Sequence, residues 1–213
     1  KYDQHRDFPL FTRSIQNWDL LRHLSPEEHP NLADIIAVFS KWTGAGDVDN
    51  QQAAIFALAG NYISKYTQKN GIADIEGVLP ESVYPKAMAY AKRYLKRHFG
   101  RLEIALGDLQ KHVRGDKVLP IGGLAESLAA LYVVPYKKGM KQSNLGDSFI
   151  LFATYGPDGV ERIESINCYG NSNRPESPHY NDQMELYLQQ KTKEISLDKT
   201  KILQEASKIY QPK

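Results

Sequence analysis

Three side chains with the chemistry of a hydrolytic triad lie close together near the C-terminal end of the sequence. They are Ser177, His179 and Asp182, within the run Ser-Pro-His-Tyr-Asn-Asp. A serine hydroxyl becomes a nucleophile when a histidine removes its proton and a carboxylate orients that histidine. Residues so near in sequence seldom meet in this geometry, because a triad is defined by positions in space. We therefore expect His179 to be a buried, hydrogen-bonded residue that fixes a loop.

Two glycine-containing motifs resemble catalytic or binding signatures. Gly146-Asp147-Ser148-Phe149 is similar to a lipase block whose serine is the nucleophile, but that block opens into a helix and this one precedes a strand-like run. Ile121-Gly122-Gly123-Leu124 could present N–H groups to an anion. It lacks the Lys-Ser/Thr of a P-loop and the third glycine of a dinucleotide fingerprint. Both motifs favour structural turns.

The metal-ligating residue types do not form a ligand pattern. The chain has six histidines and one cysteine, Cys168. No His-Glu-x-x-His run occurs, and a single cysteine excludes both an internal disulfide and a cysteine-based zinc site. We expect no metal, no cofactor and no catalytic residue within this chain.

A basic cluster lies in one predicted helix, which spans residues 81–98. Lys92, Arg93, Lys96 and Arg97, followed by His98, place like charges four residues apart. The simplest interpretation is a solvated helix face. The alternative is a surface that contacts phosphate or an acidic partner.

The composition is that of a folded protein. The chain has 213 residues, of which 41% are hydrophobic and 24% charged, and its formal net charge is +2. This balance excludes compositional disorder and argues against an ordinary electrostatic nucleic-acid binder. No apolar run approaches 18 residues, so we expect no membrane span.

Hydrophobic spacing and turn residues predict the elements that hold these motifs. Helices are expected at 26–43, which Pro30 can interrupt, from Asp49 or Asn50 to Asn70-Gly71, and at 81–98. Residues 100–120 suggest a short helix and loop. Alternating residues around Gly156-Pro157-Asp158-Gly159 predict a β-hairpin over 148–168. A loop over 170–180 and helices at 181–190 and 198–210, the second capped by Asp198, complete the prediction.

These elements predict an α+β protein with a mostly helical region over 1–140 and a hairpin, loop and C-terminal helices over 141–213. A lone hairpin is marginal in water, so we expect further strands to accompany it. The chain starts at Lys1 without an initiator methionine or a signal-peptide pattern, which leads us to expect an upstream portion.

Three blocks, in order, resemble the C-terminal end of the β-subunit of the penicillin acylase family, which includes penicillin G and acyl-homoserine-lactone acylases. The most specific block runs from Tyr169 to Gln183 and contains Gly-Asn-Ser, Ser-Pro-His-Tyr and Asp-Gln, with Asn171 where the family usually has Gln. The others are Gly107 to Asp116 followed by Leu119 to Gly123, and Trp42-Thr43-Gly44, Asp47-Val48-Asp49 and Ala54-Ile55-Phe56. The resemblance covers roughly residues 35–190.

The resemblance implies one incomplete domain of an αββα N-terminal-nucleophile (Ntn) hydrolase sandwich. Its catalytic serine would be the first residue of a β-chain and would cleave an acyl-amide bond, as in penicillins or acyl-homoserine lactones. That serine would lie upstream of Lys1, so this chain would be structural and inactive alone. Its partners would be the rest of the acylase and a small substrate, with no nucleic acid and no membrane, and the enzyme would be periplasmic or secreted. The alternative is a stand-alone helical interaction module with a basic helix face.

Overall fold

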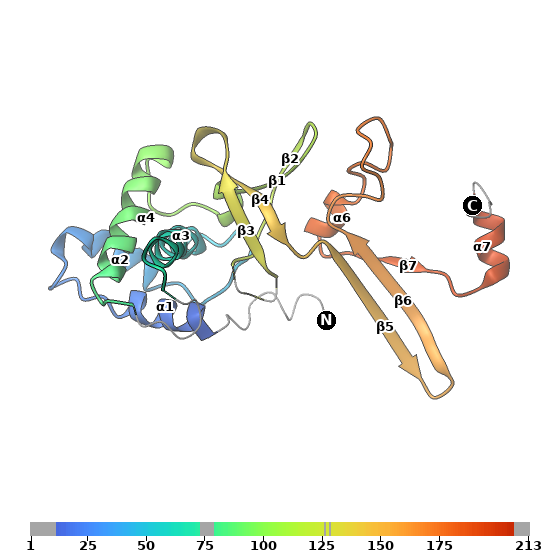
Figure 1. Ribbon diagram of the computed structural model, residues 1–213, viewed down its shortest axis with the longest axis horizontal. Coiled ribbons are helices and arrows are strands. Elements are labelled where there is room, and N and C mark those ends of the chain that lie inside the picture. The colour runs from blue at the N-terminus through green and yellow to red at the C-terminus, as the bar shows by residue number, and fades with distance from the viewer. Residues whose placement is uncertain (1–11, 73–78, 126, 128, 207–213) are drawn as a thin grey trace. The chain divides into compact units, whose positions relative to one another are not determined.

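The chain folds as an α+β protein whose contacts divide it into two compact units, residues 1–146 and 147–213. The structure is a computed structural model, and it describes residues 12–72, 79–125, 127 and 129–206. Figure 1 shows its elements. No helix in the described part has the length and apolar character needed to cross a membrane.

The first unit is built on helices that share one hydrophobic core. They are α1 (Thr12–Arg22), the short 3₁₀ helix η2 (Pro30–Leu32), α2 (Ala33–Phe39), α3 (Ala53–Asn70), α4 (Val83–Phe99) and α5 (Leu106–Leu109). Helices α3 and α4 pack against each other, and the core includes Leu58 and Leu95, both fully buried. Contacting aromatic rings of Phe39, Trp42 and Phe56 fill one part of it.

The ends of α3 and α4 agree with the predicted signals. The Asn50 side-chain oxygen accepts hydrogen bonds from the backbone N–H groups of Gln52 and Ala53 at 3.0 and 2.8 Å, which satisfies donors at the start of α3. Gly71 and Gly100 end the two helices in the left-handed conformation, with φ of 63° and 72°. The predicted helices from Asn50 and over 81–98 are therefore confirmed.

The predicted helix over 26–43 is interrupted before Pro30, as the proline indicated, and it is too long at both ends. Residues 26–28 form a turn, and the helical segments extend only from Pro30 to Phe39. Proline disfavours helical backbone in the residue before it. His29 accordingly has φ −128° and ψ 61°, so the chain re-enters a helix only after this residue.

The loop predicted over 100–120 is wrong in its second half, which forms a β-hairpin. Strands β1 (Gln110–Arg114) and β2 (Lys117–Pro120) pair antiparallel, and β3 (Leu131–Pro135) pairs antiparallel with β4 (Lys141–Gly146). The η3 turn (Lys137–Gly139) joins β3 to β4. Parallel pairing of β1 with β4 completes a sheet of order β2-β1-β4-β3. The region 1–140 therefore contains strands as well as helices.

The second unit is centred on the predicted hairpin, which is confirmed. Strand β5 (Phe149–Gly156) pairs antiparallel with β6 (Gly159–Asn167), and β7 (Lys193–Ile195) adds to β6. Helix α6 (Met184–Leu188) contacts β6, and α7 (Lys199–Glu205) begins at Asp198, whose carboxylate accepts from the Thr200 and Lys201 N–H groups. Both helices are shorter than predicted, and residues 207–210 of the second prediction lie outside the described residues.

The apolar composition of β5 predicts a buried strand, but its side chains are largely exposed. Phe149 and Leu151 are 54% and 49% exposed, whereas Ile166 of β6 is fully buried. Helix α6 contacts β6, and its buried Met184 lies in the same unit as Ile166. We attribute the exposure of β5 to the small size of α6, because a helix of five residues can cover only part of the sheet.

Candidate functional site

The segment between β6 and α6, which carries the most family-like sequence, returns on itself through backbone hydrogen bonds. The Ser172 N–H donates to the His179 carbonyl at 3.0 Å, and the Gln183 N–H donates to the Tyr169 carbonyl at 2.8 Å. The N–H groups of Ser177 and Tyr180 close two tight turns within it. The predicted loop over 170–180 is thus an ordered structure that brings residues 169–172 against 179–183.

Gly170 permits this close approach. A Cβ atom at this position would collide with the His179 carbonyl group and would lie 2.6 Å from Oδ1 of Asp182. Real Cβ atoms do not approach other heavy atoms this closely, so a side chain here requires the two arms of the loop to separate.

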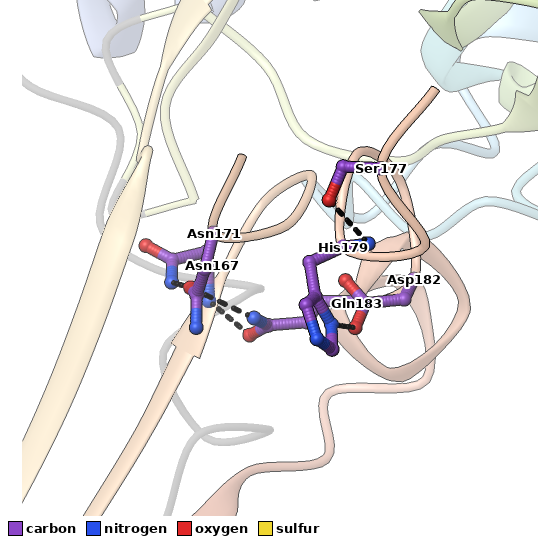
Figure 2. A network of polar contacts seen from close by, with 6 residues as sticks. All are labelled: Asn167, Asn171, Ser177, His179, Asp182 and Gln183. Carbon is purple, nitrogen blue, oxygen red and sulfur yellow. Dashed lines mark hydrogen bonds and ion pairs between the residues drawn. The ribbon is translucent and has the colours of Figure 1, made fainter. Parts of the chain in front are cut away.

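A buried glutamine ties the loop to the end of the sheet, as Figure 2 shows. Gln183 is 2% exposed, and its Oε1 accepts from the Asn167 N–H at 3.1 Å. Its Nε2 donates to Oδ1 of Asn171 at 3.0 Å, and the Asn167 side-chain amide donates to the same oxygen. The Tyr187 hydroxyl donates to the Asp147 carbonyl at 2.9 Å, which links α6 to the start of β5.

The three triad-type residues lie in this loop but do not form a triad. His179 Nδ1 is 2.9 Å from Oδ2 of Asp182, so this pair does meet. The Ser177 hydroxyl accepts from the backbone N–H of His179 at 3.2 Å, which is a local turn contact. The prediction that His179 is hydrogen-bonded within a loop is confirmed, but the prediction that it is buried is wrong, since 66% of its side chain is exposed. Its position at the tip of a surface turn explains the difference.

This arrangement holds the loop through side-chain and backbone hydrogen bonds. It does not align a hydroxyl nucleophile with the imidazole, nor does it surround a position where an oxyanion would develop. Among the described residues, no group of three or more His, Cys, Asp or Glu side chains is arranged to hold a metal ion.

The two glycine motifs prove to be packing features. The Gly123 N–H donates to the Gly46 carbonyl at 2.8 Å, and a Cβ on Gly122 would lie 2.7 Å from the same oxygen. The N–H groups of Ile121 and Gly123 donate to the protein's own backbone, at Gln110 and Gly46. Ser148 lies between β4 and β5, where its carbonyl accepts from the Cys168 N–H at 3.0 Å. The predicted turns do not form, because residues 121–123 and 147–148 are irregular connections.

A row of buried polar residues on β1 and β4 was missed by sequence reasoning. Gln110 and His112 lie on β1, and Lys141 and Ser143 on the adjacent strand β4; all four are at most 7% exposed. His112 Nδ1 lies 2.9 Å from the Ser143 hydroxyl, and Gln110 donates to the Gly123 carbonyl at 2.9 Å. The alternation of these residues with outward-facing neighbours is the signal that could have revealed two strands.

Lys141 is the charged member of this row. Its ammonium group lies 4.6 Å from the centre of the Tyr94 ring, a cation–π contact with α4. Burial lowers the pKa of Lys141, and the like charge of Lys65 lowers it further. Burial also raises the pKa of Tyr94, whose hydroxyl donates to the Gly139 carbonyl at 2.8 Å.

Comparison with known proteins places this sequence in a family. A search of curated proteins found no match. Among solved structures, the chain is similar to a thermostable penicillin G acylase from Alcaligenes faecalis, with 11% identity and a TM-score of 0.41. That alignment covers 94% of this chain and 46% of the acylase chain, so this chain spans less than half of its length. The family model described as penicillin amidase matches residues 3–204. The chain therefore belongs to the penicillin amidase family.

Proposed function

We propose that this chain is the C-terminal portion of the β-subunit of an acyl-amide hydrolase. The observation that carries the proposal is the family match over residues 3–204, which includes the Tyr169 to Gln183 block. Family membership favours this function over a stand-alone interaction module. The substrate would be an amide that joins an acyl group to an amine, such as a penicillin or an acyl-homoserine lactone.

The nucleophile in this proposal is an N-terminal serine located upstream of Lys1. Such a serine uses its own α-amine as the base, and N–H and amide donors stabilise the oxyanion. The described loop residues supply no aligned hydroxyl, which is consistent with a supporting role for this chain. We expect the chain alone to be inactive and its parent to act in the periplasm or outside the cell.

The exposed face of the second sheet supports the idea that other strands or helices cover it. Cross-strand pairing places Phe149, Leu151, Ile163 and Ile195 on one face. Phe149, Leu151 and Ile195 are 54%, 49% and 42% exposed. Ser165 and Lys193 share this face with them, and exposed apolar side chains on a sheet are the kind that a partner layer buries, as in an αββα sandwich. The remainder of the acylase would supply that layer.

The direct test is to express the uninterrupted reading frame that contains this sequence and to sequence the N-termini of its mature chains. A chain that begins with serine, together with hydrolysis of a phenylacetyl anilide or an acyl-homoserine lactone, would support the proposal. Replacing that serine with alanine should abolish turnover, and the 213-residue chain alone should show none. A frame that starts beside Lys1, or turnover by the isolated chain, would overturn it.

A further inference from the structure

The positive charge of the first unit is concentrated on three adjoining segments. Helix α3, helix α4 and the turn over residues 136–142 carry ten Lys and Arg residues and no Asp or Glu. Since the whole chain has a net charge of +2, the remaining residues carry −8. We call these three segments the basic face; its cations are Lys65, Lys69, Lys86, Lys92, Arg93, Lys96, Arg97, Lys137, Lys138 and Lys141.

A continuous set of contacts joins the three segments into one surface. Tyr62 of α3 lies 5.7 Å from Tyr90 of α4, which lies 5.8 Å from Tyr94, measured between ring centres. Tyr94 contacts His98 and donates to the Gly139 carbonyl in the turn. Helices α3 and α4 pack together (Figure 1), and α4 contacts η3. The charges therefore belong to three segments that contact one another within the first unit.

Among the described residues, most of these cations have no acidic partner. Lys92 is 2.6 Å from Asp34, and within the described part of the chain it is the one member of the ten in an ion pair. Lys141 is buried against Tyr94, and the other eight cations have exposed side chains. Like charges on neighbouring segments repel each other, and this repulsion is relieved when they meet an extended array of anions.

The apolar residues indicate which kind of partner fits. Stable protein–protein interfaces have an apolar centre depleted in charge. The large exposed hydrophobic residues of the first unit are Leu20, Val118, Tyr132, Val134 and Leu145, and none lies in the basic face. The tyrosine rings in the face contact one another and are partly buried, so they do not form an open platform for stacking single-stranded bases. The phosphates of duplex nucleic acid and of a membrane surface need neither feature. The membrane is favoured because the parent enzyme is proposed to act in the periplasm or outside the cell, so this step rests on the proposed function.

We propose that the basic face binds the surface of an anionic lipid bilayer through lipid phosphate groups, without insertion. A flat anionic surface meets many of these cations together, and each Lys or Arg near such a surface strengthens binding about fivefold. The acidic remainder of the chain does not prevent this, because charges more than about 10 Å from the surface are screened at 0.1 M salt. The expectation of no membrane partner drew on the lack of a long apolar run, and the net charge argued only against nucleic acid. Neither property of the whole chain reveals this asymmetry.

The test is co-sedimentation of the 213-residue chain with vesicles of phosphatidylglycerol and phosphatidylcholine in equal parts. We expect binding at 50 mM NaCl, its loss at 500 mM NaCl, and none to vesicles of phosphatidylcholine alone. The variant K65Q/R93Q/R97Q should bind about 100-fold more weakly. The matched variant R174Q/K199Q/K201Q has the same net charge but changes exposed residues of the second unit, and it should bind as the parent does.

Equal weakening in the two variants would show that net charge decides binding, and would overturn the proposal. So would salt-resistant binding, equal binding to neutral vesicles, or no binding to the anionic vesicles. A 20-base-pair DNA duplex and poly-glutamate serve as competing polyanions. Tighter binding to either than to the vesicles would assign the face to that class of partner. If the triple variant fails to fold, the single variants K65Q and R97Q replace it, and each should weaken binding about fivefold while K199Q does not.

Discussion

At the residue scale, Gln183 connects the loop to the sheet through one buried amide. In Gln183→Ala the Asn167 N–H loses its partner, whereas the Asn171 oxygen keeps the Asn167 side-chain amide as a donor. Leaving the N–H group unsatisfied costs about 1–3 kcal/mol, so we expect the free energy of unfolding of the second unit to fall by that amount. Urea titration followed by circular dichroism measures it. Gln189→Ala, at an exposed position, should change the value by less than about 0.5 kcal/mol.

Replacing glycine with alanine should change stability in opposite directions at Gly170 and Gly60. Gly170→Ala forces the loop arms apart and should destabilise by roughly 1–3 kcal/mol. Gly60 lies inside α3, and a Cβ there meets nothing within 4 Å. Gly60→Ala should therefore stabilise by about 0.5–1 kcal/mol, because alanine loses less backbone entropy in a helix. Thermal melts of both variants provide the measurement, and a change of the same sign in both would contradict the argument.

The loop itself could be predicted from the sequence, but its internal contacts could not. The Asn, Ser, Pro and Gly residues over 170–180 indicate turns. The pairing of His179 with Asp182 follows from a tight local turn, whereas the link from Gln183 to Asn167 joins residues 16 positions apart. Nothing in local spacing specifies that second contact or the exposure of His179. Those depend on how α6 packs on β6.

At the element scale, β1 and β4 escaped prediction because their buried positions hold polar residues. A half-buried strand is recognised when apolar residues occupy every second position. Here the alternate buried positions are Gln110 and His112 on one strand and Lys141 and Ser143 on the other. Helices α3 and α4 were predictable because their buried stripes are apolar and their ends carry Asn50, Gly71 and Gly100.

The position of Lys141 in β4 predicts a pH-dependent contribution to stability. Burial, and then Lys65, lower its pKa in the folded state, so protonation favours the unfolded chain. The charged Lys141 therefore lowers the free energy of unfolding. This loss is complete below the folded-state pKa of Lys141, and it declines as the pH rises from there toward 10.5. The wild type should therefore gain stability relative to Lys141→Met between pH 8 and 9.5.

Urea unfolding of the two proteins at several pH values measures this difference. The raised pKa values of Tyr90 and Tyr94 keep both phenols protonated across this range, so they contribute little to the comparison. Lys69→Met, at an exposed position on α3, is the control. A constant difference between wild type and Lys141→Met across the range would show that burial does not penalise the charged lysine.

At the scale of the whole molecule, net charge and apolar composition did not reveal where charged and apolar side chains lie in the structure. The near-neutral net charge hid an acid-free surface on α3, α4 and the turn over 136–142, and the apolar composition of β5 suggested burial where the strand is exposed. The α+β class and the hairpin were predictable from local patterns. The four-stranded sheet depends on pairing between distant strands, such as Gln110 with Lys141, which local patterns do not specify.

The division into two units predicts two unfolding transitions that can be observed separately. Both tryptophans, Trp18 and Trp42, lie in the first unit, and the single cysteine, Cys168, lies in the second. Tryptophan fluorescence and the reaction of Cys168 with a thiol reagent therefore each report on one unit. In urea, Gln183→Ala should lower the midpoint for Cys168 reactivity and leave the fluorescence midpoint unchanged. Leu58→Ala, a core truncation costing about 2–5 kcal/mol, should do the reverse. If both midpoints move together in both variants, the units unfold as one cooperative structure.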